Sequence, residues 1–160
     1  MKTINRFEDI KKIVFETIHQ LKNEQLKNGW FHLSSVASLS GLLALKRNLN
    51  SEICQTAGIL HDLWLYCKLP LELEVHKKHD EDGADFAEAI LKESSMYNPE
   101  ECELICRIIG SHNKKDEEHG EYEETLKDAD ALQHYINNSD YDQRYNYHGR
   151  IKPLLEELGM

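Results

Sequence analysis

The sequence predicts an all-α protein, and three observations carry this prediction. Only 3 prolines and 8 glycines occur among 160 residues. Strands with alternating polarity are hard to find, and most segments repeat their apolar residues every three or four positions, as amphipathic helices do. With 40% apolar and 30% charged residues, the chain has the composition of one globular domain. We therefore expect a single-domain helical bundle of about six or seven helices.

Periodicity and capping signals place the helices along the chain. Asn98-Pro99 combines a capping side chain with a residue preorganised for a first helical turn, and Asn50-Ser51 is a second start signal. Trp64–Lys78 and Asn113–Glu121 are the two long connections, and long connections in compact domains are often functional. We predict helices over residues 7–27, 33–47, 51–62, 80–94, 99–112, 123–138 and 150–158.

The charge balance argues against two classes of partner. The 29 acidic residues outnumber the 19 lysines and arginines, which gives a net charge of −10, whereas cationic patches bind phosphate backbones and anionic bilayers. The longest nearly apolar run, Ile59–Tyr66, is too short to span a bilayer, and the first residues form no apolar signal segment. We expect no nucleic-acid polymer and no membrane as partners, and a cytoplasmic location.

The cysteines indicate a reduced protein. Cys54, Cys67, Cys102 and Cys106 include no C-x-x-C pair and are too few for a disulfide scaffold. We expect free thiols.

Several histidines occupy positions where core residues are expected. His32 extends the apolar stripe of its helix by one turn, and His112 falls at the centre of the buried face of another. His79 shares a helix face with Gly83, which leaves room for another backbone or a ligand. His76 is a weaker candidate than His79 for the same inward direction.

Carboxylates accompany these histidines. His61 and Asp62 end an apolar run, and because adjacent helical side chains diverge by about 100°, both could contact one ion only near a helix end or with the ion between them. Asp128 and Asp130 flank the apolar stripe of a later helix equally, so periodicity admits at most one of them to a common site and does not choose between them.

Together these residues predict a metal centre. A lone inward histidine is usually a hydrogen-bonded core residue, but several buried imidazoles and a carboxylate are costly unless they pair or coordinate a cation. Mixed nitrogen and oxygen donors suit Mn, Fe, Ni, Co or Zn better than the oxygen ligands that Mg and Ca prefer. We expect one or two divalent transition-metal ions, with Mg²⁺ also admitted at a second site.

The same residues, in the same order, resemble the HD superfamily of metal-dependent phosphohydrolases, an all-α fold named for its adjacent His-Asp. Five ordered motifs carry the resemblance, over residues 32–132 of a single domain 1–160 in which 138–160 form a C-terminal helical extension. They are W-F-H at 30–32, A-G-I-L-H-D-L at 57–63 (similar to A-x-L-L-H-D-I), H-D-E-D-G-A at 79–84 (similar to H-x-x-x-G-A), I-I-G-S-H at 108–112 (similar to I-x-x-H) and A-D-A-L at 129–132 (similar to A-D-x-L).

The resemblance implies both the ligands and the reaction. The final motif favours Asp130 over Asp128, which is then expected to face solvent. The implied reaction is the attack of a metal-activated water on a small phosphorylated metabolite or nucleotide, with His61 and Asp62 as the catalytic residues. A second metal site, or the substrate, would use His79 and His112. The implied metal ligands are His32, His61, Asp62, Asp130, His79 and His112.

The resemblance leaves the substrate open. Cyclic-dinucleotide phosphodiesterases of the superfamily have two consecutive histidines where this chain has His112-Asn113. Lys114 and Lys115 are the nearest cations that could bind a phosphoryl group, although solvated loop lysines are the commoner case. A base pocket could be lined by Tyr141, Tyr145, Tyr147 and His148, although tyrosines that pack a terminal helix are commoner. The other histidines, His19, His119 and His134, are expected at the surface or behind the ligands.

Two other functions use the same residues. One is a diiron oxygenase of the same superfamily, and the other is a non-catalytic, metal-stabilised regulatory or ligand-binding domain. Metal content, oxygen uptake and turnover separate these classes. The sequence does not specify the substrate, the metal or the oligomeric state.

Overall fold

The computed structural model describes residues 5–21, 24–68, 79–137 and 149–160, and every regular element in these ranges is a helix. The predicted all-α class is therefore confirmed. None of the described helices is both long and apolar enough to cross a bilayer. In chain order the helices are α1 (Arg6–His19), α2 (Glu24–Lys46), α3 (Ser51–Leu60), α4 (Leu63–Lys68), α5 (His79–Ser94), α6 (Pro99–Ser111), α7 (Glu121–Asn137) and α9 (Ile151–Leu158).

The structure differs from the prediction at two places. The single helix predicted over 7–27 is wrong, because α1 ends at His19, and the start predicted at residue 33 for the next helix is wrong, because α2 has begun by Glu24. Apolar periodicity continues through this turn and does not register the change of direction. Gly29, a poor residue for a helix interior, lies inside α2 where the ring of Tyr66 packs against it, 2.6 Å from where a Cβ would be. The second difference is α4, which forms at the start of the predicted connection Trp64–Lys78.

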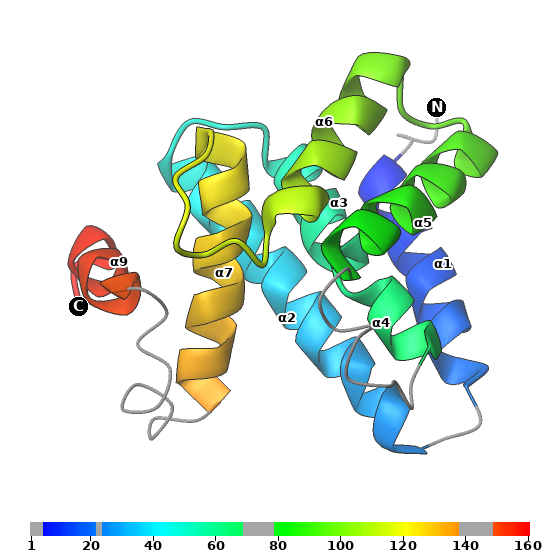
Figure 1. The fold of residues 1–160 in the computed structure, drawn as a ribbon, viewed down its shortest axis with the longest axis horizontal. Coiled ribbons are helices and arrows are strands. Elements are labelled where there is room, and N and C mark those ends of the chain that lie inside the picture. The colour runs from blue at the N-terminus through cyan, green and yellow to red at the C-terminus, as the bar shows by residue number, and fades with distance from the viewer. Residues whose placement is uncertain (1–4, 22–23, 69–78, 138–148) are drawn as a thin grey trace.

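The long helix α2 is the centre of the bundle, with α3 and α7 packed against it (Figure 1). The contact between α2 and α3 is close because Gly58 faces the backbone of Ala37. A Cβ on Gly58 would lie 2.8 Å from the Cα of Ala37, a distance that real side chains do not adopt. This approach brings the middle of α2 close to the C-terminal end of α3.

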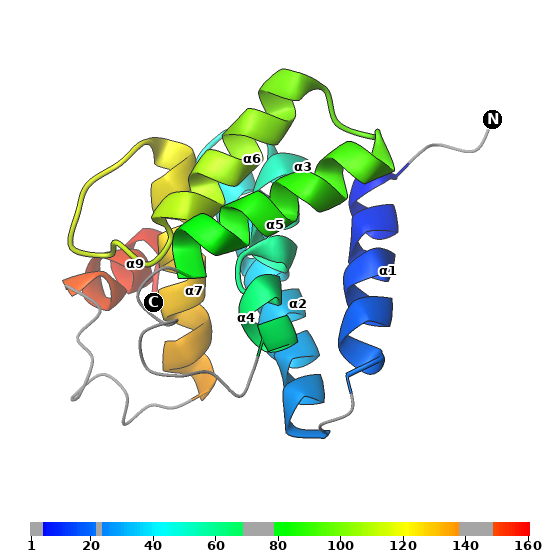
Figure 2. The ribbon, with the colours of Figure 1, turned by 45° about the vertical axis from the view of Figure 1, so that its right-hand side comes forward.

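A second glycine brings α5 close to the same point. A Cβ on Gly83 would lie 3.3 Å from the carbonyl oxygen of His61, so the space predicted at Gly83 is taken by another backbone. In Figure 2, α5 and α6 run side by side across the bundle, in keeping with the packing of these two helices. The start of α5 and the end of α3 therefore meet.

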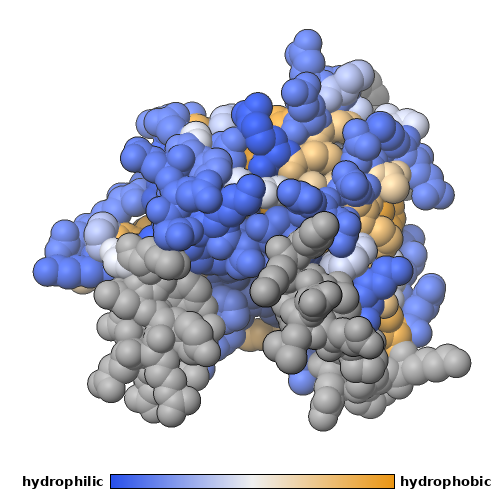
Figure 3. All heavy atoms as spheres, viewed as in Figure 1, coloured by the Kyte–Doolittle hydropathy of each residue, from blue (hydrophilic) through white to orange (hydrophobic). Residues whose placement is uncertain are grey.

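The face seen in Figure 3 is largely hydrophilic, with hydrophobic residues gathered at the upper right, where α5 and α6 lie. The apolar core beneath comes from all the larger helices, including Ile10 of α1, Leu33 of α2 and Ile105 of α6, none of which has exposed area. All four cysteines are free, as predicted, and Cys54 and Cys102 are buried.

Candidate metal centre

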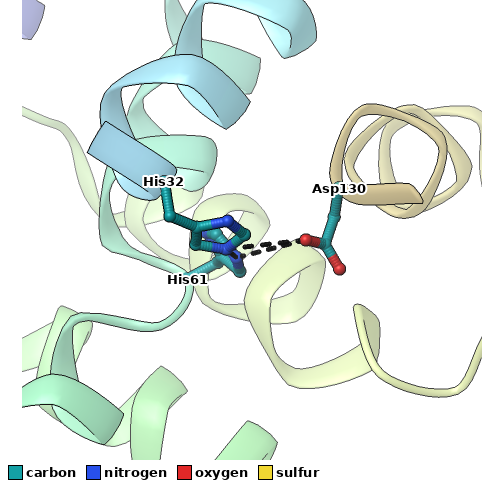
Figure 4. A group of neighbouring side chains, drawn as sticks. All are labelled: His32, His61 and Asp130. Atoms are coloured by element: carbon teal, nitrogen blue, oxygen red, sulfur yellow. Dashed lines mark hydrogen bonds and ion pairs between the residues drawn. The ribbon is translucent and has the colours of Figure 1, made fainter. Parts of the chain in front are cut away.

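Three helices deliver the first group of polar side chains to one point inside the bundle. His32 comes from α2, His61 follows the last residue of α3, and Asp130 comes from α7. Figure 4 shows the three side chains pointing toward one another. The Nε2 atoms of His32 and His61 are 3.2 Å apart, and they lie 3.6 Å and 3.9 Å from Oδ1 of Asp130.

Asp62 joins this group from the turn after α3. Its Oδ2 lies 3.7 Å from Nε2 of His32 and 3.5 Å from Nε2 of His61. Ligand atoms around an ion with bonds of about 2.1 Å stand roughly 3.0 to 3.4 Å apart. The distances from the two Nε2 atoms to each other and to the carboxylate oxygens, 3.2 to 3.9 Å, are equal to or slightly longer than this spacing. We call these four groups the first cluster.

The other oxygen of Asp62 faces a second pair of histidines. Its Oδ1 lies 3.2 Å from Nε2 of His112, which follows α6, and 3.7 Å from Nε2 of His79, the first residue of α5. We call these three groups the second cluster. One carboxylate thus faces four imidazoles, two from each side, and the two clusters adjoin at Asp62.

Hydrogen bonds fix which nitrogen of each ring faces inward. Nδ1 of His61 lies 2.8 Å from the carbonyl oxygen of Gly58, and Nδ1 of His112 lies 2.7 Å from that of Ile109. Nδ1 of His32 similarly faces Oε1 of Gln133 at 2.9 Å. Because oxygens of this kind only accept, Nδ1 carries the proton in each ring, and the Nε2 lone pairs of the neutral rings converge on the carboxylates.

Electrostatics favours a neutral His61 and ionised carboxylates. Burial lowers the pKa of His61 to about 4. Burial also lowers the pKa of His32, but the carboxylates of Asp62 and Asp130 outweigh it and raise the pKa above its ordinary value. For Asp62, burial raises the pKa, but the surrounding histidines hold it well below the ordinary value. His61 is thus a neutral imidazole beside an ionised carboxylate, and these are donor types that transition metals bind.

Unpaired oxygens supply a direct test of whether a metal fits. Oδ1 of Asp62 and Oδ1 of Asp130 are buried and accept no hydrogen bond within the described residues. The approach of lone pairs at Nε2 of His112 and Oδ1 of Asp62 is unfavourable unless a proton or a metal ion lies between them. The donor atoms therefore fit divalent metal ions at both clusters.

Lys115 lies beside the first cluster. Its Nζ is 2.7 Å from Oδ2 of Asp130, and its side chain is 8% exposed. The interpretation of Lys115 as a solvated loop lysine is therefore wrong, whereas Lys114 is exposed. The lysine holds one oxygen of Asp130 and leaves the other facing His32 and His61. Nε2 of His134 lies 3.3 Å from Oδ1 of Asp130, so His134 adjoins the ligands, as one of the two expectations for it allowed.

The loop that carries Lys115 follows α6 and matches the predicted connection over residues 113–121. It is held by Lys127 of α7, which has no exposed area. Nζ of Lys127 donates to the carbonyl oxygen of Glu117 at 2.8 Å and to Oε1 of Glu124 at 2.8 Å, and lies 2.7 Å from Nδ1 of His119. A buried cation thus fixes the position of this polar loop.

The structure separates the two aspartates that periodicity left tied. Asp130 faces the histidines, whereas Asp128 accepts hydrogen bonds from Nη2 of Arg47 at 2.7 Å and from Nη1 of Arg150 at 2.9 Å. The expectation that Asp128 faces solvent is wrong, because its side chain is only 13% exposed. The arginines come from the residue after α2 and from the residue before α9, and the sequence pattern around Asp128 contains neither.

Two residues near the clusters were not predicted. Gln133 lies one turn after Asp130 and faces Nδ1 of His32. Asp80 follows His79 and is buried, with Oδ1 3.3 Å from Nε2 of His79. The signal that could have found Asp80 is the second His-Asp dipeptide of the chain. His76, His148 and the tyrosines at 141, 145 and 147 lie outside the described residues.

A model of the HD domain family matches residues 29–135. The matched segment contains both clusters and ends two residues after Gln133, and the predicted resemblance to this family is confirmed. No curated protein and no solved structure matches the chain significantly.

Proposed function

The chain belongs to the HD domain family, and from this premise we propose that it is a metal-dependent phosphohydrolase acting on a small phosphorylated metabolite or nucleotide. The family consists mostly of such enzymes. The observation that carries the proposal is the position of Asp62. Its two oxygens face separate pairs of imidazole nitrogens at 3.2 to 3.7 Å, so one carboxylate would join two adjoining ion sites.

The first cluster would hold one divalent ion through His32, His61, Asp62 and Asp130. The second would hold another through Asp62, His79 and His112. An ion bound there would lower the pKa of water toward neutrality and would withdraw charge from a phosphoryl oxygen.

The chain's own residues would organise this chemistry. Asp62 would keep the two sites at a fixed separation, and the Nδ1 hydrogen bonds would keep each imidazole lone pair directed inward. Lys115 would hold Asp130 and add positive charge beside the reacting phosphate. Both functions are compatible, because an ammonium has three donors. Lys114, which is exposed, is the weaker candidate for binding substrate.

The proposal extends to the partner and the compartment. An acidic chain can bind a phosphorylated small molecule because bound ions supply local positive charge, whereas a nucleic-acid polymer needs an extended cationic surface. We propose a cytoplasmic location, where the free thiols of Cys54 and Cys102 would stay reduced.

The test is metal analysis of the purified protein followed by a turnover screen. We expect one or two transition-metal ions per chain, and release of phosphate from phosphorylated metabolites or nucleotides with Mn²⁺, Ni²⁺, Co²⁺ or Mg²⁺. Turnover should be abolished by Asp62→Asn, which removes the charge at the junction of the clusters, and retained by Asp82→Asn, which removes an exposed charge from α5.

Two other outcomes would reject hydrolysis. Iron in the purified protein with substrate-dependent oxygen uptake would indicate a diiron oxygenase. Bound metal with no turnover across the screen would indicate a domain in which the metal is structural.

A further inference from the structure

We propose that Asp80 is a fourth ligand of the second ion, beside His79, His112 and Oδ1 of Asp62. The inference rests on the metal centre of the proposed function and does not depend on which reaction the centre performs. Asp80 is not among the ligands that the sequence motifs imply.

The position of Asp80 is the first support. The residue is 8% exposed, and its Oδ1 is buried and accepts no hydrogen bond from the described residues. That oxygen lies 3.3 Å from Nε2 of His79 and 4.0 Å from Nδ1 of His112. The Nδ1 proton of His112 is directed to the carbonyl oxygen of Ile109, so it does not satisfy Asp80. With either ring nitrogen of each histidine counted, His79, Asp80 and His112 form a group whose possible ligand atoms lie within 4.8 Å of one another.

A helix-dipole role does not explain this burial. Asp80, Glu81 and Asp82 all lie in the first turn of α5, where a carboxylate interacts favourably with the helix N-terminus. Glu81 and Asp82 supply that interaction from exposed positions. A carboxylate buried with an unpaired oxygen is costly unless a cation reaches it, and the first-turn role does not require Asp80 to be buried.

The charge balance of the two clusters supports the same assignment. The first cluster has the carboxylate of Asp130 to itself and shares Asp62. Without Asp80, the second cluster would have only its share of Asp62. With Asp80, each ion is held by two imidazoles, one carboxylate of its own and one carboxylate in common. The affinities of the two sites for a divalent ion should then be similar, because each donor set carries the same charge.

The experiment counts Mn²⁺ ions on wild-type protein, Asp80→Asn and Asp82→Asn. Free Mn²⁺ is followed by its electron paramagnetic resonance signal during titration, and the dialysed proteins are checked by elemental analysis. Asp82→Asn is the matched control because it removes the same charge from the same helical turn at an exposed position. We expect two ions on wild type and on Asp82→Asn. Asp80→Asn should lower the affinity for the second Mn²⁺ ion by a factor on the order of 10 to 100 or more and leave the first ion bound.

The second readout is thermal stability. Each equivalent of Mn²⁺ should raise the melting temperature of wild-type protein, because the ion binds only the folded site. In Asp80→Asn the rise from the second equivalent should be lost. Asp80→Ser, which is also neutral but smaller, replaces Asp80→Asn in both measurements if the latter does not fold.

Contrary outcomes separate this inference from the proposed function. Two ions bound to Asp80→Asn with wild-type affinity would overturn the role of Asp80 and leave the phosphohydrolase proposal intact; Asp80 would then pair with a protonated His79. A single ion on wild-type protein would overturn the second site. Wild-type protein that binds no Mn²⁺ would overturn both.

Discussion

Two aspartates of α7, separated by one alanine, lie in opposite electrostatic environments. Asp128 is bound by the guanidinium groups of Arg47 and Arg150. Asp130 is held by Lys115 through one oxygen, while its other oxygen lies among imidazoles without a hydrogen bond. Both side chains are largely buried, at 13% and 7% exposed. Both carboxylate oxygens of Asp128 are thus bound by arginine, whereas at Asp130 one oxygen is bound by lysine and the other accepts no hydrogen bond.

The charge of Asp128 stabilises the fold, whereas the position of Asp130 fits a role in binding a metal ion. The network around Asp128 also includes Glu124 and Glu157, which contact Arg150 and Arg47 at 2.6 Å and 2.7 Å. Every group in it has an opposite charge within the chain. Asp130 has such a partner, Lys115, at one oxygen only, and its Oδ1 is buried beside imidazoles without a hydrogen bond, a position that a bound cation would stabilise. Burial alone therefore does not distinguish the two aspartates, whereas an unpaired carboxylate oxygen that faces imidazole nitrogens does.

The largest expected effect follows from removing the charge of Asp130. Asparagine keeps the volume of aspartate but not its charge, so Asp130→Asn should weaken Mn²⁺ binding at the first cluster by a factor on the order of 10 to 100 or more, with a matching loss of turnover. Mn²⁺ titration of the variant measures this. Asp128→Asn is the matched control, and its Mn²⁺ affinity should equal that of wild type. The reverse ranking would show that the open oxygen of Asp130 does not mark the ligand.

A smaller effect on folding is expected from Asp128→Asn. The substitution removes a partner from both Arg47 and Arg150, but each arginine keeps a glutamate. The free energy of unfolding should therefore fall by about 1 to 2 kcal/mol, less than for breaking an isolated buried pair. Urea denaturation of the metal-free variant and of wild type gives this value. A change within about 0.5 kcal/mol would be typical of a surface charge and would contradict a structural role for the network.

The smallest effects are expected from pH, and the two regions should respond in different ranges. Burial lowers the pKa of His112, but Asp62 outweighs it and raises the pKa above the ordinary 6.5, as it does for His32. Protons should therefore compete with Mn²⁺ as the pH falls through and below neutrality. In the network, the hydrogen bond from Arg47 lowers the pKa of Glu157 below 4.5. The contribution of Glu157 to the free energy of unfolding is present above pH 4.5 and is lost only as the pH falls through the lowered pKa.

Mn²⁺ titrations at several pH values and urea denaturation of the metal-free protein test the two ranges separately. Glu157→Gln removes the titrating group and should reduce the acid sensitivity of unfolding without altering the pH dependence of Mn²⁺ binding. If Mn²⁺ affinity and the free energy of unfolding declined over the same pH range in wild type and in Glu157→Gln, the metal centre and the network around Asp128 would be coupled. That result would contradict their independent titration.

The sequence predicted most of the helices and the side chains that face inward from them. It did not predict where one helix ends and the chain changes direction. Periodicity placed α6 to within one residue and pointed His32 and His112 inward, because one helix face is enough to specify each of these. It merged α1 with the start of α2, since an apolar repeat does not record a reversal of direction. Asp128 and Asp130 stayed tied because the partners that distinguish them, Arg47 and Lys115, come from other parts of the chain.

The contact between His32 and Gln133 joins residues 101 positions apart. Loop closure over such a distance is entropically expensive, so the first cluster does not exist until α7 has folded back onto α2. An ion therefore cannot template the early stages of folding. During synthesis, loading should follow emergence of α7 from the ribosome, and the metal-free bundle has to persist long enough to be loaded. Once bound, the ion would tie α2 and α3 to α7, so its expected kinetic signature is slower unfolding with little change in the folding rate.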